Sequence, residues 1–351
     1  MKYFKYILFL LLIAIIAIAI YVAVQPNDYS VSRTKTIQAP TSLIYKEVID
    51  FKNWEDWNAW VEEKPDMTIT YPDKTEGIDG SYSWIDNTET GTMTTTDTNP
   101  NKTITQTMQF GEYPSSEVTW LFEDNKDGST DVTWTISGNN LPFGFKAYNA
   151  FNGGIDKQIG PYYERSLELL DKKVVESMKQ YSVNVNGVTE HGGGFYLYNT
   201  TSAKMDNFKD KIKEMLPKVG QYFTKNNIIP SGAPFVIYHK WDLENNSVMF
   251  SCAMPTADKV ITTEDDILTG QLLPFKALKT TLKGNYSNLE EAWNTAMAYQ
   301  KDNNLITDQT GVALEVYLTD PTNTANPAEW ITEIYLPLAP NNNNYNTLQS
   351  H

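Results

Sequence analysis

One acidic residue, Glu315, is placed where its carboxylate could bind a cation. It belongs to an alternating stretch, Ala313–Leu318, that is typical of a β-strand, and alternate residues of a strand face opposite sides. The face that begins with Leu314 is wholly apolar, and we expect it to pack on helices. Glu315 shares the other face with Ala313, whose small side chain leaves space, and with Tyr317, which supplies a ring and a hydroxyl.

A carboxylate on such a partly desolvated face needs a partner, or its pKa rises. A bound cation would be a suitable partner, and each well-placed aromatic ring would add about 0.5–2 kcal/mol of attraction. The alternative is that Glu315 is an exposed strand residue or pairs with a lysine. The candidate rings in the C-terminal half are Tyr196, Tyr198, Tyr238, Tyr286, Tyr317, Trp241, Trp293 and Trp330.

Few other residues could do chemistry. Cys252 is the single cysteine and lies in a strand-like run, so we expect a small buried side chain and no disulfide. The three histidines, His191, His239 and His351, show no spacing that resembles a zinc site. We therefore expect no metal and no cofactor, and no confident catalytic residue, with Glu315 the candidate if the protein is an enzyme.

Residues 178–340 contain an internal duplication. Each block reads as a strand, a helix and two further strands, and in both blocks a glycine precedes a tyrosine by the same interval. The matching pieces are the strands Tyr181–Val188 and Phe275–Leu282, the helices Met205–Phe223 and Leu289–Lys301, and the motifs Gly232–Tyr238 and Gly311–Tyr317.

The whole duplicated region, residues 178–340, resembles the gyrase-inhibitor-like, or AraC-type effector-binding, domain family. The residues that carry the resemblance are Lys283–Tyr286 with Leu289 and Trp293, then Glu315–Tyr317, then Trp330–Leu338.

In that family two such units pair side by side, and the cleft between them binds small molecules. In its multidrug-sensing members a glutamate of the matching strand meets lipophilic cations, and by resemblance Glu315 takes that place. Those sensors also carry a DNA-binding domain, whereas this chain begins with an apolar segment. The implied ligand-binding residues are Glu315, Tyr317, Tyr286, Trp293, Tyr238 and Tyr335.

The preceding part, residues 31–177, predicts a second kind of domain. Its order is a strand at Tyr29–Gln38, two short helices, about six strands and one closing helix, Phe145–Ser177, with a flexible point at Gly153-Gly154. This order, with Ile37–Pro40 and Phe51–Asn58, resembles the START-like superfamily, which includes polyketide cyclases. The resemblance implies an antiparallel sheet wrapped around a long helix, with a cavity for apolar, lipid-like ligands.

An uncharged apolar run, Ile7–Val24, stands near the N-terminus and is long enough to span a bilayer. Val22–Pro26 is a poor cleavage site, so we expect an uncleaved single-pass anchor and not a signal peptide. Lys2 and Lys5 precede the run, which predicts a cytoplasmic N-terminus and extracytoplasmic or periplasmic soluble domains.

The expected fold class is α+β. The expected parts are a membrane anchor at 1–25, a linker at 26–30, a helix-grip START-like domain at 31–177, a duplicated strand–helix–strand–strand effector-binding domain at 178–340, and a disordered tail at 341–351.

The net charge of the chain indicates which kinds of partner it can bind. The 28 basic and 43 acidic residues give a net charge of −15 without any basic cluster, so we expect no nucleic-acid partner. The absence of a recognisable catalytic set favours a membrane-anchored protein that binds a small lipophilic or cationic molecule. The alternatives are a hydrolase of small electrophilic molecules that uses Glu315 as its acid–base group, and a membrane-tethered protein-interaction or signalling module.

Overall fold

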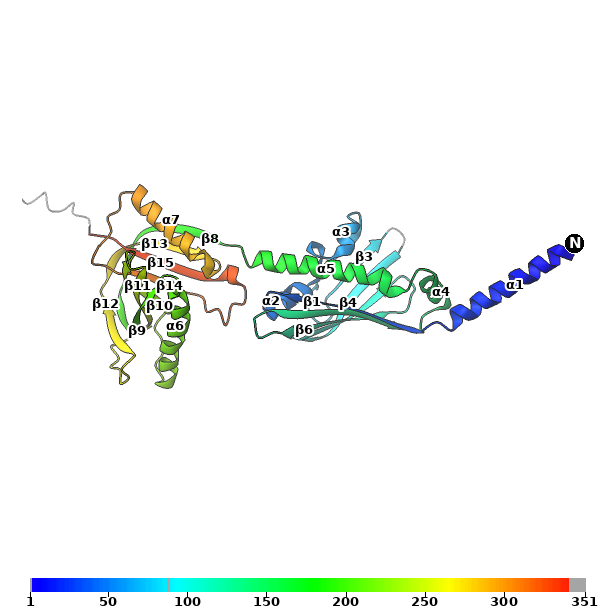
Figure 1. Ribbon diagram of the computed structural model, residues 1–351, viewed down its shortest axis with the longest axis horizontal. Coiled ribbons are helices and arrows are strands. Elements are labelled where there is room, and N and C mark those ends of the chain that lie inside the picture. The colour runs from blue at the N-terminus through cyan, green and yellow to red at the C-terminus, as the bar shows by residue number, and fades with distance from the viewer. Residues whose placement is uncertain (1, 87–88, 341–351) are drawn as a thin grey trace, which may run out of the picture. The chain divides into compact units, whose positions relative to one another are not determined.

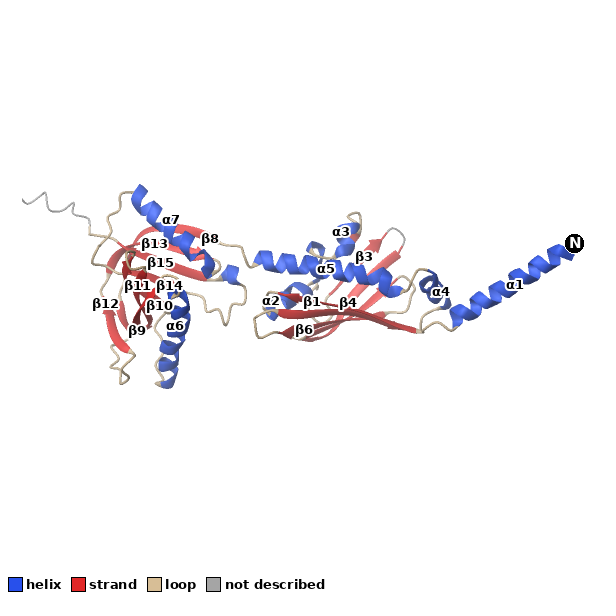
Figure 2. Cartoon of the chain, viewed as in Figure 1, coloured by secondary structure: helices blue, strands red, loops and turns tan. Residues whose placement is uncertain are grey.

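The computed structural model describes residues 2–86 and 89–340. The chain is an α+β protein that divides into two compact units, Met1–Ser177 and Met178–His351, each built on one antiparallel sheet (Figures 1 and 2). The tail at 341–351, for which the sequence predicts disorder, lies outside the described residues.

The apolar run near the N-terminus forms helix α1 (Lys2–Ala23), and its side chains from Tyr3 to Tyr21 are exposed. Its segment Tyr3–Ala23 is long and apolar enough to cross a membrane. Such a helix near an N-terminus fits both a membrane anchor and a signal sequence.

The first unit contains a seven-stranded antiparallel sheet in the order β1-β7-β6-β5-β4-β3-β2. Each strand from β2 to β7 is hydrogen-bonded to its neighbour in the sequence, as the predicted meander requires, and β1 closes the far edge beside β7. The strands are β1 (Asp28–Ile37), β2 (Thr68–Thr70), β3 (Ser81–Asp86), β4 (Glu89–Asn99), β5 (Thr103–Phe110), β6 (Ser116–Asp124) and β7 (Thr130–Asn139).

The helical segments of this unit are α2 (Thr41–Ile49), η1 (Phe51–Asp56), α3 (Ala59–Glu63), α4 (Phe143–Phe151) and α5 (Ile155–Ser177). The single closing helix that the sequence predicts is instead two helices. Gly153 and Gly154 have φ values of +84° and +89°, a left-handed conformation that glycine adopts readily and that a continuous helix does not allow.

Helix α5 packs one stripe of side chains onto the sheet, including Tyr163, Leu167, Leu170 and Val174 at helical spacing. The ring of Tyr163 stacks on Trp134 of β7, with 3.7 Å between centroids. The core beside this contact is rich in tryptophan: the fully buried side chains include Trp54, Trp57, Trp120 and Trp134.

The second unit contains an eight-stranded antiparallel sheet in the order β12-β9-β11-β10-β14-β15-β13-β8. Its strands are β8 (Ser182–His191), β9 (Gly194–Lys204), β10 (Phe235–Asp242), β11 (Ser247–Thr256), β12 (Leu268–Leu272), β13 (Phe275–Lys283), β14 (Ala313–Tyr317) and β15 (Ile331–Pro337). Its helical segments are α6 (Phe208–Lys225), η2 (Tyr286–Asn288), α7 (Leu289–Asp302) and η3 (Pro327–Glu329).

The duplication is real, but the predicted first strand of the first block is wrong. The strand that leads into α6 is β9, where the sequence predicts no strand, and it corresponds to β13 before α7. The predicted strand at Tyr181–Val188 is β8, which pairs with β13 of the other block, just as β12 pairs with β9. Each block therefore supplies the edge strand of the other.

Candidate functional site

Glu315 lies at the centre of the second sheet. The shift that superposes Gly232 on Gly311 carries Val236 onto Glu315 and Tyr238 onto Tyr317. Val236 is also the residue that faces Glu315 across the pair β10–β14. The pseudo-twofold axis of the duplication therefore passes between these two residues. One block carries the carboxylate on this axis, and the other carries valine.

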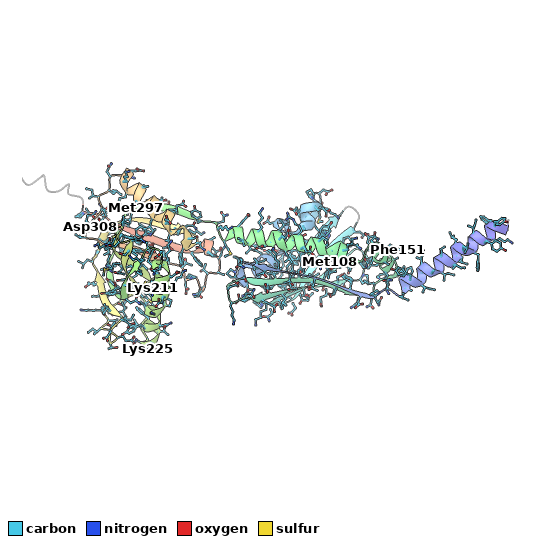
Figure 3. The ribbon with its side chains drawn as sticks, in the orientation of Figure 1. Met108, Phe151, Lys211, Lys225, Met297 and Asp308 are labelled. Atoms are coloured by element: carbon cyan, nitrogen blue, oxygen red, sulfur yellow. The ribbon has the colours of Figure 1, made fainter. Side chains whose placement is uncertain are left out.

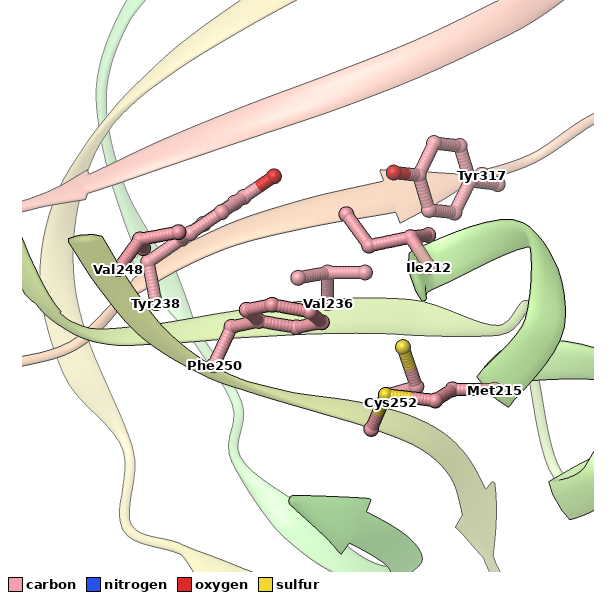
Figure 4. Close-up of a cluster of buried hydrophobic side chains, with 8 residues drawn as sticks. All are labelled: Ile212, Met215, Val236, Tyr238, Val248, Phe250, Cys252 and Tyr317. Atoms are coloured by element: carbon pink, nitrogen blue, oxygen red, sulfur yellow. The ribbon is translucent and has the colours of Figure 1, made fainter. Parts of the chain in front are cut away.

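The carboxylate faces the helices, which corrects the prediction made for this strand. The face that begins with Leu314 packs against other strands of the sheet, including Tyr196 of β9 and Phe235 of β10, and not on the helices. The opposite face, with Tyr317, packs against Ile212 of α6. Figure 4 shows the hydroxyl groups of Tyr238 and Tyr317 directed toward one another on this face.

Glu315 is only 4% exposed, and neutral side chains hydrogen-bond its two oxygens. The indole Nε1 of Trp293, on α7, donates to Oε1 at 2.5 Å. The hydroxyl of Tyr317 donates to Oε2 at 2.7 Å. Tyr238, the counterpart of Tyr317 in the first block, also lies close enough to this carboxylate to lower its pKa.

Burial is the largest influence on this carboxylate, and it raises the pKa of Glu315 above its ordinary value. Hydrogen bonds from Trp293, Tyr317 and Tyr238 act in the opposite direction and do not cancel it. Lys209, an exposed residue of α6, supplies positive charge, but its influence is smaller than that of the three neutral donors. The arrangement is a desolvated acid between neutral donors.

A pH dependence of stability follows from this raised pKa. The folded protein retains a proton that the unfolded chain releases, so the stabilising contribution is full below the ordinary pKa of 4.5 and is lost as pH rises through the raised value. In urea unfolding at a series of pH values, we expect the stability of Glu315→Gln to match that of the wild type below the ordinary pKa and to exceed it increasingly as pH rises through the raised pKa of Glu315. If the wild type instead became more stable relative to Glu315→Gln as pH rises, the expectation would be contradicted. Such a result would show that a positively charged group pairs with Glu315 in the folded state.

The rings that the sequence proposes around Glu315 separate into two groups. On the helix-facing side, Tyr238 stacks with Trp241 at 5.0 Å and meets Trp293 at 5.5 Å between centroids. Tyr286 meets Tyr317 at 5.3 Å and Trp330 at 4.7 Å.

Tyr196 and Tyr198 contact one another and pack with Phe235 in the strand-facing cluster, away from the carboxylate. The rings that accompany Glu315, which we call the aromatic wall, are Tyr238, Trp241, Trp293, Tyr286, Tyr317 and Trp330.

The aromatic wall extends from the buried carboxylate to solvent. Tyr238 and Tyr317 are buried, Trp293 is partly exposed, and the side chain of Trp241 is 41% exposed. A continuous series of ring contacts therefore joins the exposed Trp241, through Trp293, to the carboxylate of Glu315.

Tyr335 does not belong to this group, although the sequence analysis includes it among the ligand-binding residues. It follows Ile334, which faces Glu315 across β14–β15, so its side chain points to the other face of the sheet. There its hydroxyl donates to Glu333 at 2.6 Å, and Lys279 pairs with the same carboxylate at 2.6 Å. The alternation of the strand is the signal that would have placed it there.

The other side chains that could do chemistry have structural roles in the second unit. Cys252 is buried, as predicted, and burial raises the pKa of its thiol to about 12, which disfavours a thiolate nucleophile. The ring of His239 lies 2.7 Å from the hydroxyl of Ser251. Within residues 2–86 and 89–340, no cluster of three or more His, Cys, Asp or Glu side chains could hold a metal ion.

The first unit contains a cavity of about 260 Å³ between its sheet and α5. Its lining is mostly apolar, with Glu55, Asn58 and Lys64 as the polar exceptions. Trp54 and Trp60 are among the residues that line it. The strand residues of the lining include Trp84, Met93, Met108, Phe110, Trp134 and Ile136.

The comparison with protein families concerns the second unit. The model of the GyrI-like family, described as a small molecule binding domain, matches residues 199–339. These residues form a GyrI-like small-molecule-binding domain. The match includes β10, β14, α6 and α7, and therefore Glu315 and the whole aromatic wall.

Solved structures with some similarity to the chain include three that correspond to less than half of it. The C-terminal domain of EcmrR is 21% identical, with 45% of this chain and 98% of that chain covered and a TM-score of 0.40. SAV2435 bound to tetraphenylphosphonium is 10% identical, with 46% and 94% covered and a TM-score of 0.34. Protein CV1439 from Chromobacterium violaceum is 13% identical, with 41% and 96% covered and a TM-score of 0.32. A search of curated proteins gives no match.

Proposed function

We propose that the protein is a membrane-anchored binding protein whose GyrI-like domain takes up a small lipophilic cation at Glu315. The observation that carries this proposal is a carboxylate that is 4% exposed, raised in pKa and hydrogen-bonded by neutral side chains. A buried carboxylate without a positive partner is costly, and a bound cation removes that cost.

The surroundings of Glu315 favour one class of cation. A metal ion or a primary ammonium ion would have to lose strongly bound water, and the aromatic wall offers few oxygen atoms to replace it. A lipophilic cation with its charge spread over an apolar body loses much less hydration. Its periphery can contact ring faces such as those of Trp293 and Tyr317, which also attract positive charge.

Access to the carboxylate is part of the proposal. Trp293 is partly exposed and holds Oε1 through its indole nitrogen, so a change of its rotamer would open one side of Glu315. Tyr317 would keep its hydrogen bond to Oε2 meanwhile and fix the carboxylate in place. We therefore assign Glu315 the role of charge partner, Trp293 that of a movable ring and Tyr317 that of a positioning donor.

The direct test compares a cation with a neutral molecule of similar shape. Tetraphenylphosphonium and triphenylphosphine oxide would be titrated against the full chain in nanodiscs, with empty nanodiscs as the blank. We expect the cation to bind at least about tenfold more tightly, a difference of ~1.4 kcal/mol. Equal affinity for the two molecules would show that shape and not charge governs binding, and would refute the role of Glu315.

A second binding function is supported by the cavity of the first unit. We propose that this unit is a START-like domain whose apolar cavity holds one lipid-like molecule. The antiparallel sheet against a long α5 and the mostly apolar lining support this reading. We also propose that α1 is retained as an anchor, with Lys2 and Lys5 on the cytoplasmic side.

Gly91 of β4 offers a test of the cavity from the strand beside Trp84. A methyl group at Gly91 would lie 2.1 Å from the ring of Trp84, which lines the cavity, so Gly91→Ala must displace that ring. We expect weaker binding of a fluorescent fatty acid, whereas Gly144→Ala, where the methyl group meets nothing within 4 Å, should bind as the wild type does. Unchanged binding in Gly91→Ala would argue against a ligand beside Trp84.

A further inference from the structure

Helix α4 of the first unit presents aromatic side chains to the outside. Phe143, Tyr148 and Phe151 are 55%, 56% and 63% exposed. At 3.6 residues per turn they span an arc of about 140° of the helix, with Phe151 between the other two. We call these three residues the aromatic face of α4. Phe145, which is only partly exposed, holds the helix to the unit through contacts with Tyr29 and Tyr113.

The charge around this face is unusual for so acidic a chain. No Asp or Glu occurs from Gly138 to Ile155, although the chain carries 43 acidic residues. The one charged residue in that stretch, Lys146, is bound through its Nζ to the backbone carbonyl of Gln25 at 3.2 Å. An exposed aromatic face without acidic neighbours suits the interfacial region of a bilayer, where tyrosine and other aromatic rings are favoured.

The aromatic face also lies beside the apolar helix α1. Phe151 and Tyr21, in the last turns of α4 and α1, have ring centroids 6.3 Å apart. Only Val24–Asn27 separate α1 from β1, and four extended residues reach at most about 14 Å. If α1 spans the membrane, the end of the sheet at which β1 begins therefore stays at the bilayer surface.

The cavity of the first unit reaches the same end of the sheet. Phe110, the last residue of β5, lines the cavity, and the backbone nitrogen of Tyr113 donates to its carbonyl oxygen at 3.2 Å. Tyr113 in turn meets Phe145 of α4, with 5.5 Å between ring centroids. In Figure 3, Phe151 marks the α4 end of the unit, and the cavity residue Met108 lies farther along the sheet.

We propose that the aromatic face of α4 inserts into the headgroup region of the lipid bilayer beside α1. The occupant of this face is lipid, since α1 beside it is itself exposed and apolar. The contact holds the Phe110 end of the cavity against the membrane, so a lipid-like ligand would enter from the bilayer. This inference rests on the membrane attachment given in the proposed function.

The experiment attaches an environment-sensitive fluorophore to the full chain in vesicles of phosphatidylcholine and phosphatidylglycerol. Gly144→Cys places the label on α4, where a side chain meets nothing within 4 Å. The matched control is Lys126→Cys, in the exposed turn between β6 and β7 at the opposite end of the sheet. Cys252 is buried and contributes little labelling, which the unmodified chain checks.

We expect acyl-chain spin labels to quench the fluorophore at position 144 severalfold more strongly than the one at position 126. The triple variant Phe143→Ser, Tyr148→Ser, Phe151→Ser should remove most of this difference, while Leu121→Ser, at an exposed apolar residue of β6, should leave it unchanged.

Other results would overturn the inference in distinguishable ways. Equal quenching at the two positions in a chain that still floats with the vesicles would refute the α4 contact alone. A blue shift at position 144 without quenching would mean that protein, such as a second copy of the chain, covers the face. A chain that does not float with the vesicles would refute the membrane attachment as well.

Discussion

Replacing Glu315 by glutamine is expected to weaken tetraphenylphosphonium binding by about tenfold to a hundredfold, or ~1.4–2.8 kcal/mol. The substitution keeps the shape, and the amide can accept from Trp293 and donate to the Tyr317 hydroxyl, but it removes the charge that the cation neutralises. Equilibrium dialysis of the full chain in nanodiscs would measure the change.

The control for this prediction is Glu333→Gln on the other face of the same sheet. It changes the net charge by the same amount, but Glu333 is paired with Lys279 and lies away from the aromatic wall. We expect its affinity for the cation to equal that of the wild type. Equal losses in the two variants would mean that the acidic protein attracts the cation only through its overall field.

The second large effect concerns stability. We expect Trp54→Ala to lower the free energy of unfolding of the first unit by about 3–5 kcal/mol. Trp54 is 2% exposed, its indole donates to the carbonyl of Val48 at 2.8 Å, and its ring contacts Trp57, Trp120 and Trp134.

Trp84→Ala is the matched variant, since Trp84 lines the same cavity but is only partly buried. We expect Trp84→Ala to lower the free energy of unfolding of the first unit by only about 1 kcal/mol. Urea unfolding of the chain, followed separately for each unit, would measure both. A loss in Trp54→Ala that spreads equally to the second unit would contradict the division into two compact units.

The sequence was informative where a local pattern has one physical meaning. The alternation of Ala313–Tyr317 placed Glu315 and Tyr317 on one face of the strand, where Tyr317 donates to the carboxylate, whereas the choice of Glu315 as a site residue came mostly from the family resemblance. The resemblance implies Trp293 only as a ligand-binding residue, and its hydrogen bond to Glu315 could not be predicted, because no local rule joins two residues on different elements.

The prediction that the Leu314 face of β14 packs on the helices is wrong for a physical reason. The Leu314 face looked like the buried one because it is wholly apolar, yet in this sheet both faces are buried. A charged residue next to helices is tolerated here because Trp293 and Tyr317 supply donors. Tyr335 was misplaced with it, since membership of a family motif says nothing about which face a residue occupies.

Strand β9 was missed because polar residues at Asn199–Ser202 hide its alternation. The break between α4 and α5 was foreseen only as a flexible point, although two successive glycines with positive φ end a helix there. The cavity of the first unit could not be located from the sequence, because its volume depends on how closely α5 approaches the sheet.

The most direct measurement is to locate a bound cation crystallographically. Tetraphenylarsonium has the shape of tetraphenylphosphonium, and its arsenic atom gives an anomalous signal that marks the position of the charge. The account predicts a peak beside the carboxylate of Glu315, between Trp293 and Tyr317, and no such peak in Glu315→Gln. A peak in the cavity of the first unit alone, or one beside position 315 that persists in Glu315→Gln, would contradict it.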